Sequence, residues 1–93
     1  MSRAKRPELL LRKSTQRALI SRYMKLASTL ELPVIDAAKI AGASERALWD
    51  WRNGTSRMRV TSATNVIRAT AILKKRLREK KARDAWRARH SSR

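Results

Sequence analysis

Several residue types are missing or rare in this chain of 93 residues, and each absence excludes a class of protein. There is no cysteine, which excludes disulfide frameworks and thiolate metal sites and is compatible with a reducing compartment. No apolar run approaches the length of a membrane span or of a signal-peptide core. We therefore expect a soluble, intracellular chain.

The residues that enzymes need are also scarce. His90 is the only histidine and lies four residues from the end, without a partner for a metal site or a catalytic triad. With two glycines in all, there is no phosphate-cradling loop, and the acidic residues form no metal-ligand cluster. We expect no enzyme activity, no cofactor and no metal.

Acidic residues are few, and basic residues are abundant: seven Asp and Glu face 24 Lys and Arg, for a net charge of +17 and a pI near 11.9. Such an excess predicts a polyanionic partner, because each neutralised phosphate releases counterions. Nucleic acid comes first among the candidates, far ahead of an anionic membrane surface.

The charge divides the chain into three parts. Residues 1–13 hold five basic residues and one acid, residues 14–73 hold nine and four, and residues 74–93 hold ten and two. The length suits one small domain with tails. We predict a basic arm at 1–13, a domain at 14–77 and a basic extension at 78–93. The arm is a solvated leader in the favoured interpretation, and a segment lying along a groove in the other.

Helical periodicity predicts one helix before and one helix after the middle of the domain. Ser14 or Thr15 is expected to cap a first helix that stops near Thr29 to Glu31, ahead of Pro33. Residues 55–61 are expected to form a polar connection. Thr61 or Ser62 is expected to cap a last helix that continues toward residue 89, with one apolar side made of Val66, Ile67, Thr70, Leu73 and Leu77.

Residues 34–54 read as two short helices joined by a tight turn. Small residues at 37, 38 and 41 allow a close approach between the helices, and Gly42 suits the left-handed conformation that ends the first of them. Ser44 is a suitable cap for a second helix over 45–53, on which Leu48 and Trp51 form a buried stripe. Gly54 closes it.

This stretch resembles the lambda-repressor/Cro-type (XRE-like) helix-turn-helix family. The matching residues are Ala38, Gly42, Ala43-Ser44, Leu48 and Trp51-Arg52-Asn53-Gly54. The likeness is in register over residues 34–54 and extends more weakly over 14–77. It implies an all-α domain of four to five helices whose helix 45–53 enters the major groove of DNA.

The resemblance also implies the roles of individual residues. Base reading falls to Glu45, Arg46, Trp49 and Asp50; phosphate contacts fall to Ser44, Asn53, Arg57 and Arg59; the core of the motif is Ala38, Gly42, Leu48, Trp51 and Gly54. Arg46 has the chemistry to bind guanine, and Glu45 the chemistry to accept from cytosine N4. Three points stay open: whether Asn53 caps its helix instead, whether Trp49 touches DNA or protein, and whether the acids reject wrong bases or pair with arginine.

The function implied is a sequence-specific transcriptional regulator, a repressor of phage, plasmid or bacterial type, acting as a homodimer on double-stranded DNA in a bacterial or phage-infected cytoplasm. One alternative is a nucleoid-associated or DNA-packaging protein, similar to a small terminase subunit; a less favoured one is an RNA-binding protein. The basic extension has three interpretations. The favoured one is a nonspecific electrostatic grip on DNA. The others are a dimerisation helix that uses Leu73, Leu77 and Trp86, and an arginine-rich RNA-binding helix in which Trp86 stacks on a base.

Overall fold

The structure is a computed structural model, and it describes residues 9–90. These residues form four helices, α1 (Lys13–Thr29), α2 (Val34–Ile40), α3 (Glu45–Asn53) and α4 (Val60–His90). Within this range the one piece of extended pairing is an isolated antiparallel bridge between Leu10 and Arg59. The expected all-α class is confirmed.

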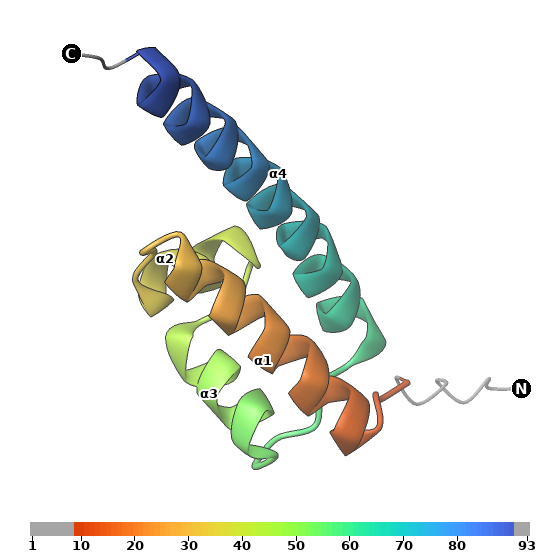
Figure 1. The fold of residues 1–93 in the computed structure, drawn as a ribbon. Coiled ribbons are helices and arrows are strands. Elements are labelled where there is room, and N and C mark those ends of the chain that lie inside the picture. Colours follow the sequence, from red (N-terminus) through yellow and green to blue (C-terminus); the bar gives the residue numbers. More distant parts are fainter. Residues whose placement is uncertain (1–8, 91–93) are drawn as a thin grey trace, which may run out of the picture.

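Helix α1 lies in the middle of the domain and packs against both α3 and α4 (Figure 1). Its apolar stripe supplies three fully or nearly fully buried side chains, Ile20, Tyr23 and Ala27. Around them packs a core built from all four helices and the last loop: Ala37, Ala38, Ala41, Leu48, Met58, Ala63, Val66, Ala69 and Leu73. Burial of this apolar surface is the main force holding the helices together.

The start of α1 differs from the prediction. Neither Ser14 nor Thr15 caps the helix, because the helix already begins at Lys13, and its N-cap is Arg12, whose side chain makes no capping hydrogen bond. The preceding chain is held by long-range backbone pairing: the Leu11 N–H donates to the Met58 carbonyl at 2.8 Å, and the Val60 N–H donates to the Leu9 carbonyl at 2.9 Å. Residues 9–12 therefore lie against the domain, whereas residues 1–8 of the expected arm are outside the described range.

The end of α1 is confirmed at Thr29. It closes with a Schellman motif, in which the Leu32 N–H donates to the Ala27 carbonyl at 2.8 Å and the Glu31 N–H donates to the Ser28 carbonyl at 2.9 Å. The motif places Glu31 at a φ of 59°, a left-handed conformation that glycine usually provides. Pro33 then stands as the N-cap of α2.

Tyr23 ties α1 to α2 inside the core. Its hydroxyl donates a buried hydrogen bond of 2.6 Å to the Ala37 carbonyl, which satisfies both groups. Burial raises the pKa of this phenol above its ordinary value of 10.0, and the charge of Arg76 lowers it to a smaller extent. The phenol is therefore neutral at neutral pH and can donate this hydrogen bond.

A buried glutamine fastens the loop between α3 and α4. The Gln16 amide donates to the Trp51 carbonyl at 3.0 Å and to the Ser56 carbonyl at 2.6 Å, while its oxygen accepts from the Met58 N–H at 2.7 Å. Met58 itself is fully buried, so the connection over 55–61, expected to be polar, also contributes one residue to the core. Because its amide nitrogen and oxygen together make three hydrogen bonds, the glutamine can be buried at little cost.

Helix α4 begins before its expected caps. Val60 is its first residue, so Thr61 and Ser62 lie inside the first turn, and the Ala63 N–H bonds to the Arg59 carbonyl. One expected core residue, Ile67, is 58% exposed, because the buried face follows Ala63, Val66, Ala69, Thr70 and Leu73 instead. The expected continuation toward residue 89 is confirmed, since α4 runs without a break to His90.

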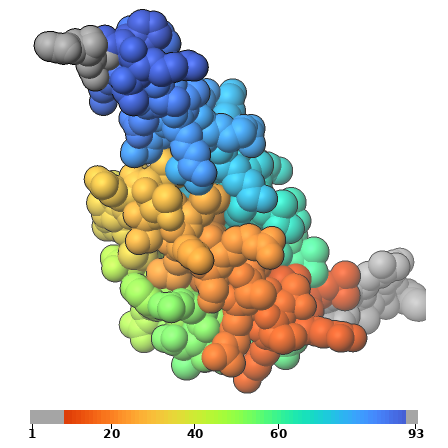
Figure 2. Space-filling view, viewed as in Figure 1, coloured from red at the N-terminus to blue at the C-terminus, as the bar shows by residue number. Residues whose placement is uncertain are grey.

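The last turns of α4 project beyond the other three helices. Figure 1 shows α4 running alongside α1 and continuing past its C-terminal end, and Figure 2 shows the same segment as a lobe standing clear of the rest. Every residue from 81 to 90 is exposed.

In the described part of the chain, no helix has both the length and the apolar character required to cross a bilayer.

Candidate nucleic-acid interface

The turn between α2 and α3 fixes how α3 is presented. Gly42 has a φ of +70°, and around it the Ala43 N–H donates to the Ala38 carbonyl at 2.8 Å, which completes a second Schellman motif. The Ser44 hydroxyl accepts from the Ala47 N–H at 3.0 Å and so caps α3, as its sequence predicts. With both helix ends satisfied, the direction of α3 is set by four residues of backbone.

Leu48 anchors α3 and is fully buried, as is Ala38 on α2. Trp51 lies less deep than the sequence leads one to expect: it is half-buried and packs against the edge of the core. Gly54 ends the helix at a φ of +80°. These contacts hold one side of α3 against α1 and leave the other side to solvent.

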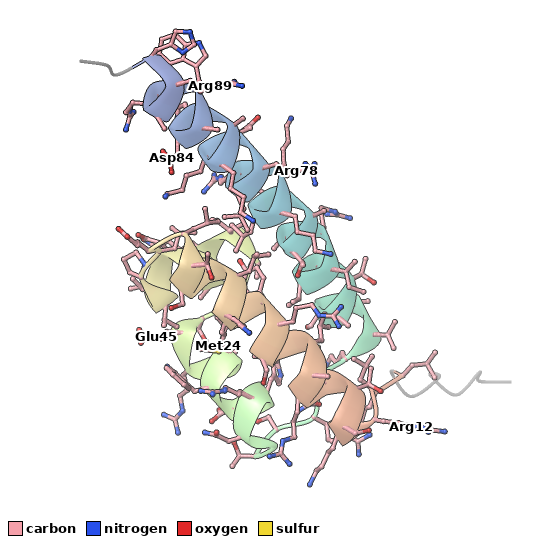
Figure 3. All side chains as sticks on the ribbon, viewed as in Figure 1. Arg12, Met24, Glu45, Arg78, Asp84 and Arg89 are labelled. Carbon is pink, nitrogen blue, oxygen red and sulfur yellow. The ribbon has the colours of Figure 1, made fainter. Side chains whose placement is uncertain are left out.

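The solvent side of α3 carries the predicted base-reading residues. The Arg46 side chain is 90% exposed, Trp49 is 37% exposed, and Glu45 and Asn53 are exposed as well. Figure 3 labels Glu45 at the beginning of α3. The structure thus brings Ser44, Glu45, Arg46, Trp49, Asp50 and Asn53 onto one short helix and its cap.

Asp50 has two partners that sequence reasoning left undecided or missed. Its carboxylate lies 3.8 Å from Arg46 Nε, one helical turn earlier, and it accepts a hydrogen bond of 3.1 Å from the Thr55 hydroxyl. At this exposure the ion pair contributes at most about 1 kcal/mol to stability. The pair mainly affects the position of Arg46. The Asp50 carboxylate holds the Arg46 guanidinium along the helix, and the remaining guanidinium donors stay available for another partner.

Trp49 also has a neighbour that the sequence analysis did not assign. The Arg52 guanidinium carbon lies 5.6 Å from the centroid of the indole, within the range of a cation–π contact. The spacing of three residues on a helix is the signal that could have identified this pair. The contact orients an indole that would otherwise be free to swing on the surface.

Arg57 and Arg59, the other two predicted phosphate contacts, lie in the loop that Gln16 holds. Arg57 is exposed, and its Nε and Nη2 both donate to the Leu11 carbonyl, at 3.0 and 2.6 Å. It therefore also joins the loop to the segment before α1. The Arg59 side chain is exposed, and its backbone pairs with Leu10 in the isolated bridge.

Comparison of the chain with family models, with curated proteins and with solved structures found no match. Inferences about function therefore rest on the geometry of the described residues. No group of three or more metal-ligating side chains occurs among residues 9–90. The feature that distinguishes the surface is an exposed helix face with two arginines, a tryptophan and two acids.

Proposed function

We propose that this protein is a sequence-specific regulator of transcription that binds double-stranded DNA with the exposed face of α3, in the manner of lambda-repressor/Cro-type helix-turn-helix proteins. The observation that supports it most is the arrangement of α3, where buried Leu48 anchors one side and Arg46, Trp49 and Glu45 lie on the other. An α-helix fits the major groove, which is about 12 Å wide.

The side chains on this face suit base recognition. Arg46 is exposed and can form a bidentate pair with guanine, and Glu45 can accept from the N4 amino group of cytosine. A surface that used charge alone would gain nothing from Glu45 and Asp50, since carboxylates near phosphates weaken binding. Their presence beside Arg46 supports a reader of sequence over a nonspecific binder.

A homodimer on a pseudo-palindrome, with repression as the outcome, completes the proposal. One helix of nine residues contacts only a few base pairs, so two-fold pairing on adjacent half-sites is the way such a helix reaches useful selectivity. The dimer is expected to leave α3 of each copy one helical turn of DNA apart, about 34–36 Å between half-site centres.

The test is a selection of binding sites from random duplex DNA with the full chain at about 0.15 M salt, a concentration at which surface electrostatics is already screened. An enriched inverted repeat, bound about a thousandfold more tightly than scrambled duplex, is the expected result. Strong, salt-sensitive binding to every duplex without an enriched motif would overturn the proposal.

A matched pair of variants locates the reading surface. Arg46→Ala should weaken binding to the selected site by about 1–3 kcal/mol and relax the preference at one base pair. Arg68→Ala removes the same charge from an exposed position on α4, outside the reading helix, and should leave that preference intact. Equal losses for Arg46→Ala on the selected and the scrambled duplex would contradict base reading by Arg46.

The second candidate is a nucleoid-associated or DNA-packaging protein, and the net charge of +17 favours it. Such a protein would bind duplex through many phosphate contacts, and its affinity would fall steeply with salt on every sequence, by a slope of about 0.9 per contact. The selection experiment separates the two functions directly.

A further inference from the structure

The exposed end of α4 is not needed to build the core. Leu73 is the last fully buried residue of the helix, Leu77 is half-buried, and residues 81–90 are all exposed. At a rise of about 1.5 Å per residue, these ten residues extend roughly 15 Å beyond the packed part of α4. Isolated helices of this length are marginal, and this one persists because it continues a helix that the core already holds.

Trp86 lies on this segment, and a neighbouring side chain fixes the orientation of its indole. It is 57% exposed, although tryptophan is on average one of the more buried residue types. The His90 imidazole stacks on the indole with ring centroids 4.1 Å apart and an interplanar angle of 17°. The same histidine is fastened by a contact of 2.8 Å between its Nδ1 and the Trp86 carbonyl. One indole face is therefore covered by a ring, which orients it, while more than half of the side chain stays open.

Positive charge surrounds the indole. Arg83, Arg87 and Arg89 are exposed and lie within one helical turn of Trp86. Figure 3 labels Arg89 near the end of α4 and Arg78 earlier on the same helix. The single acid between residues 80 and 90 is Asp84, and Lys80 Nζ lies 3.2 Å from its carboxylate, so this acid opposes the arginines little.

We propose that the C-terminal segment of α4 is a second binding site, one that takes single-stranded nucleic acid. An unpaired base stacks on the open face of Trp86, and Arg83, Arg87 and Arg89 hold the flanking phosphates. A base in a duplex has both faces occupied by its neighbours and cannot be stacked on in this way, whereas every unpaired base presents a π face. The site therefore selects strand state, and it is independent of base reading by α3.

The other two interpretations of the extension fit the structure less well. A dimerisation helix using Leu73, Leu77 and Trp86 would need Leu73, which the domain's own core buries completely. A grip on the duplex held by α3 meets the obstacle that the projecting end of α4 lies at the opposite end of the molecule from α3 (Figure 1). A purely electrostatic grip also gives no role to an oriented, half-exposed indole.

The experiment measures binding of the full chain to three fluorescein-labelled probes by anisotropy: a short oligouridylate, the matching oligothymidylate and a blunt random duplex. Trp86→Ala should weaken binding to the single strands by about 5- to 100-fold, while Trp86→Phe, which keeps an aromatic face, should retain most of the affinity. Duplex affinity should be unchanged by either variant. The ratio of uridylate to thymidylate affinity tells whether the natural strand is RNA or DNA.

Control variants make the result specific. Trp49→Ala removes the exposed tryptophan of α3 and should leave single-strand binding as it is. A double variant, Arg87→Gln with Arg89→Gln, should lower the salt slope of single-strand binding by about 0.7 per lost phosphate contact. Because residues 81–90 are exposed, the variants at Trp86, Arg87 and Arg89 are expected to fold, and far-UV circular dichroism checks the fold of every variant.

Two outcomes would overturn the inference. Unchanged single-strand affinity in Trp86→Ala would remove the stacking site, and an equal loss on single strands and duplex would show that the site does not select strand state. Either result leaves base reading by Arg46 untouched, and a failed search for an operator would leave the single-strand result standing.

Discussion

Replacing Gln16 by leucine should destabilise the domain strongly, although leucine is apolar, of similar size and would enter a buried position. The Met58 N–H would lose its acceptor inside the core, at a cost of about 1–3 kcal/mol. The carbonyls of Trp51 and Ser56 would lose their donor as well, but these bonds are only partly buried, so water recovers part of the loss. The expected total is about 3 kcal/mol, a large fraction of the roughly 5–15 kcal/mol that stabilises a small domain.

The assay is urea unfolding followed by far-UV circular dichroism. Gln16→Leu should lower the midpoint while leaving the slope against urea unchanged, because the folded state keeps its compactness. Thr15→Ala, at the exposed neighbouring position of α1, is the control and should cost less than about 0.5 kcal/mol. A loss of less than about 1 kcal/mol for Gln16→Leu would refute the idea that this side chain fastens the loop.

Three further predictions concern single features of the structure. Gly42→Ala should lower the free energy of unfolding in urea by about 1–2 kcal/mol from backbone strain alone, since nothing lies within 4 Å of the added Cβ. Glu31→Gly should instead raise the free energy of unfolding by up to about 1 kcal/mol, because Glu31 has a positive φ. Changes of the same sign for the two variants would contradict this reasoning. Tyr23→Phe should cost about 1 kcal/mol near neutral pH, and this difference should shrink above pH 10.0, where the unfolded phenol ionises before the folded one; a difference that grows with pH would contradict the raised pKa. Removing residues 85–93 should leave the thermal midpoint within a few degrees, since the described part of that segment is exposed, while abolishing stacking on the single-strand probes.

Local sequence signals predicted the elements that local interactions build. The bounds of α3 follow from a capping serine and a terminal glycine, and the end of α1 follows from the approach of Pro33. Each of these signals acts within a few residues of the place it marks, so a single sequence is sufficient to read it.

The errors share a different cause, which is contact between distant parts of the chain. Ser14 and Thr15 fail as caps because residues 9–12 are fixed by pairing with residues 58–60. No role was assigned to Gln16 from the sequence, and its burial makes sense only beside a loop 35 to 42 residues away. Periodicity was also too coarse to separate Ile67, which is exposed, from its buried neighbour Val66.

At the candidate site the sequence predicted which residues share a helix but not how they are arranged. It offered the Arg46–Asp50 pair as one alternative among others, and the structure contains that pair. It gave Arg57 to phosphate, and the structure turns that guanidinium toward the Leu11 carbonyl, a contact between residues 46 positions apart that no local signal predicts. The base-reading roles remain a prediction for the selection experiment.

The unbroken course of α4 has a geometric consequence for the two proposed binding surfaces. Within one helix, the direction of a side chain is a matter of residue count: each inserted residue turns everything beyond it by about 100° and advances it by about 1.5 Å. One alanine inserted after Lys81 would turn Trp86 and its arginines to another side of the helix, whereas seven would bring them back to within about 20° of their original direction. The number of residues between the two surfaces therefore sets the angle between them. A series of insertions can change this angle in steps while every side chain at both surfaces stays the same.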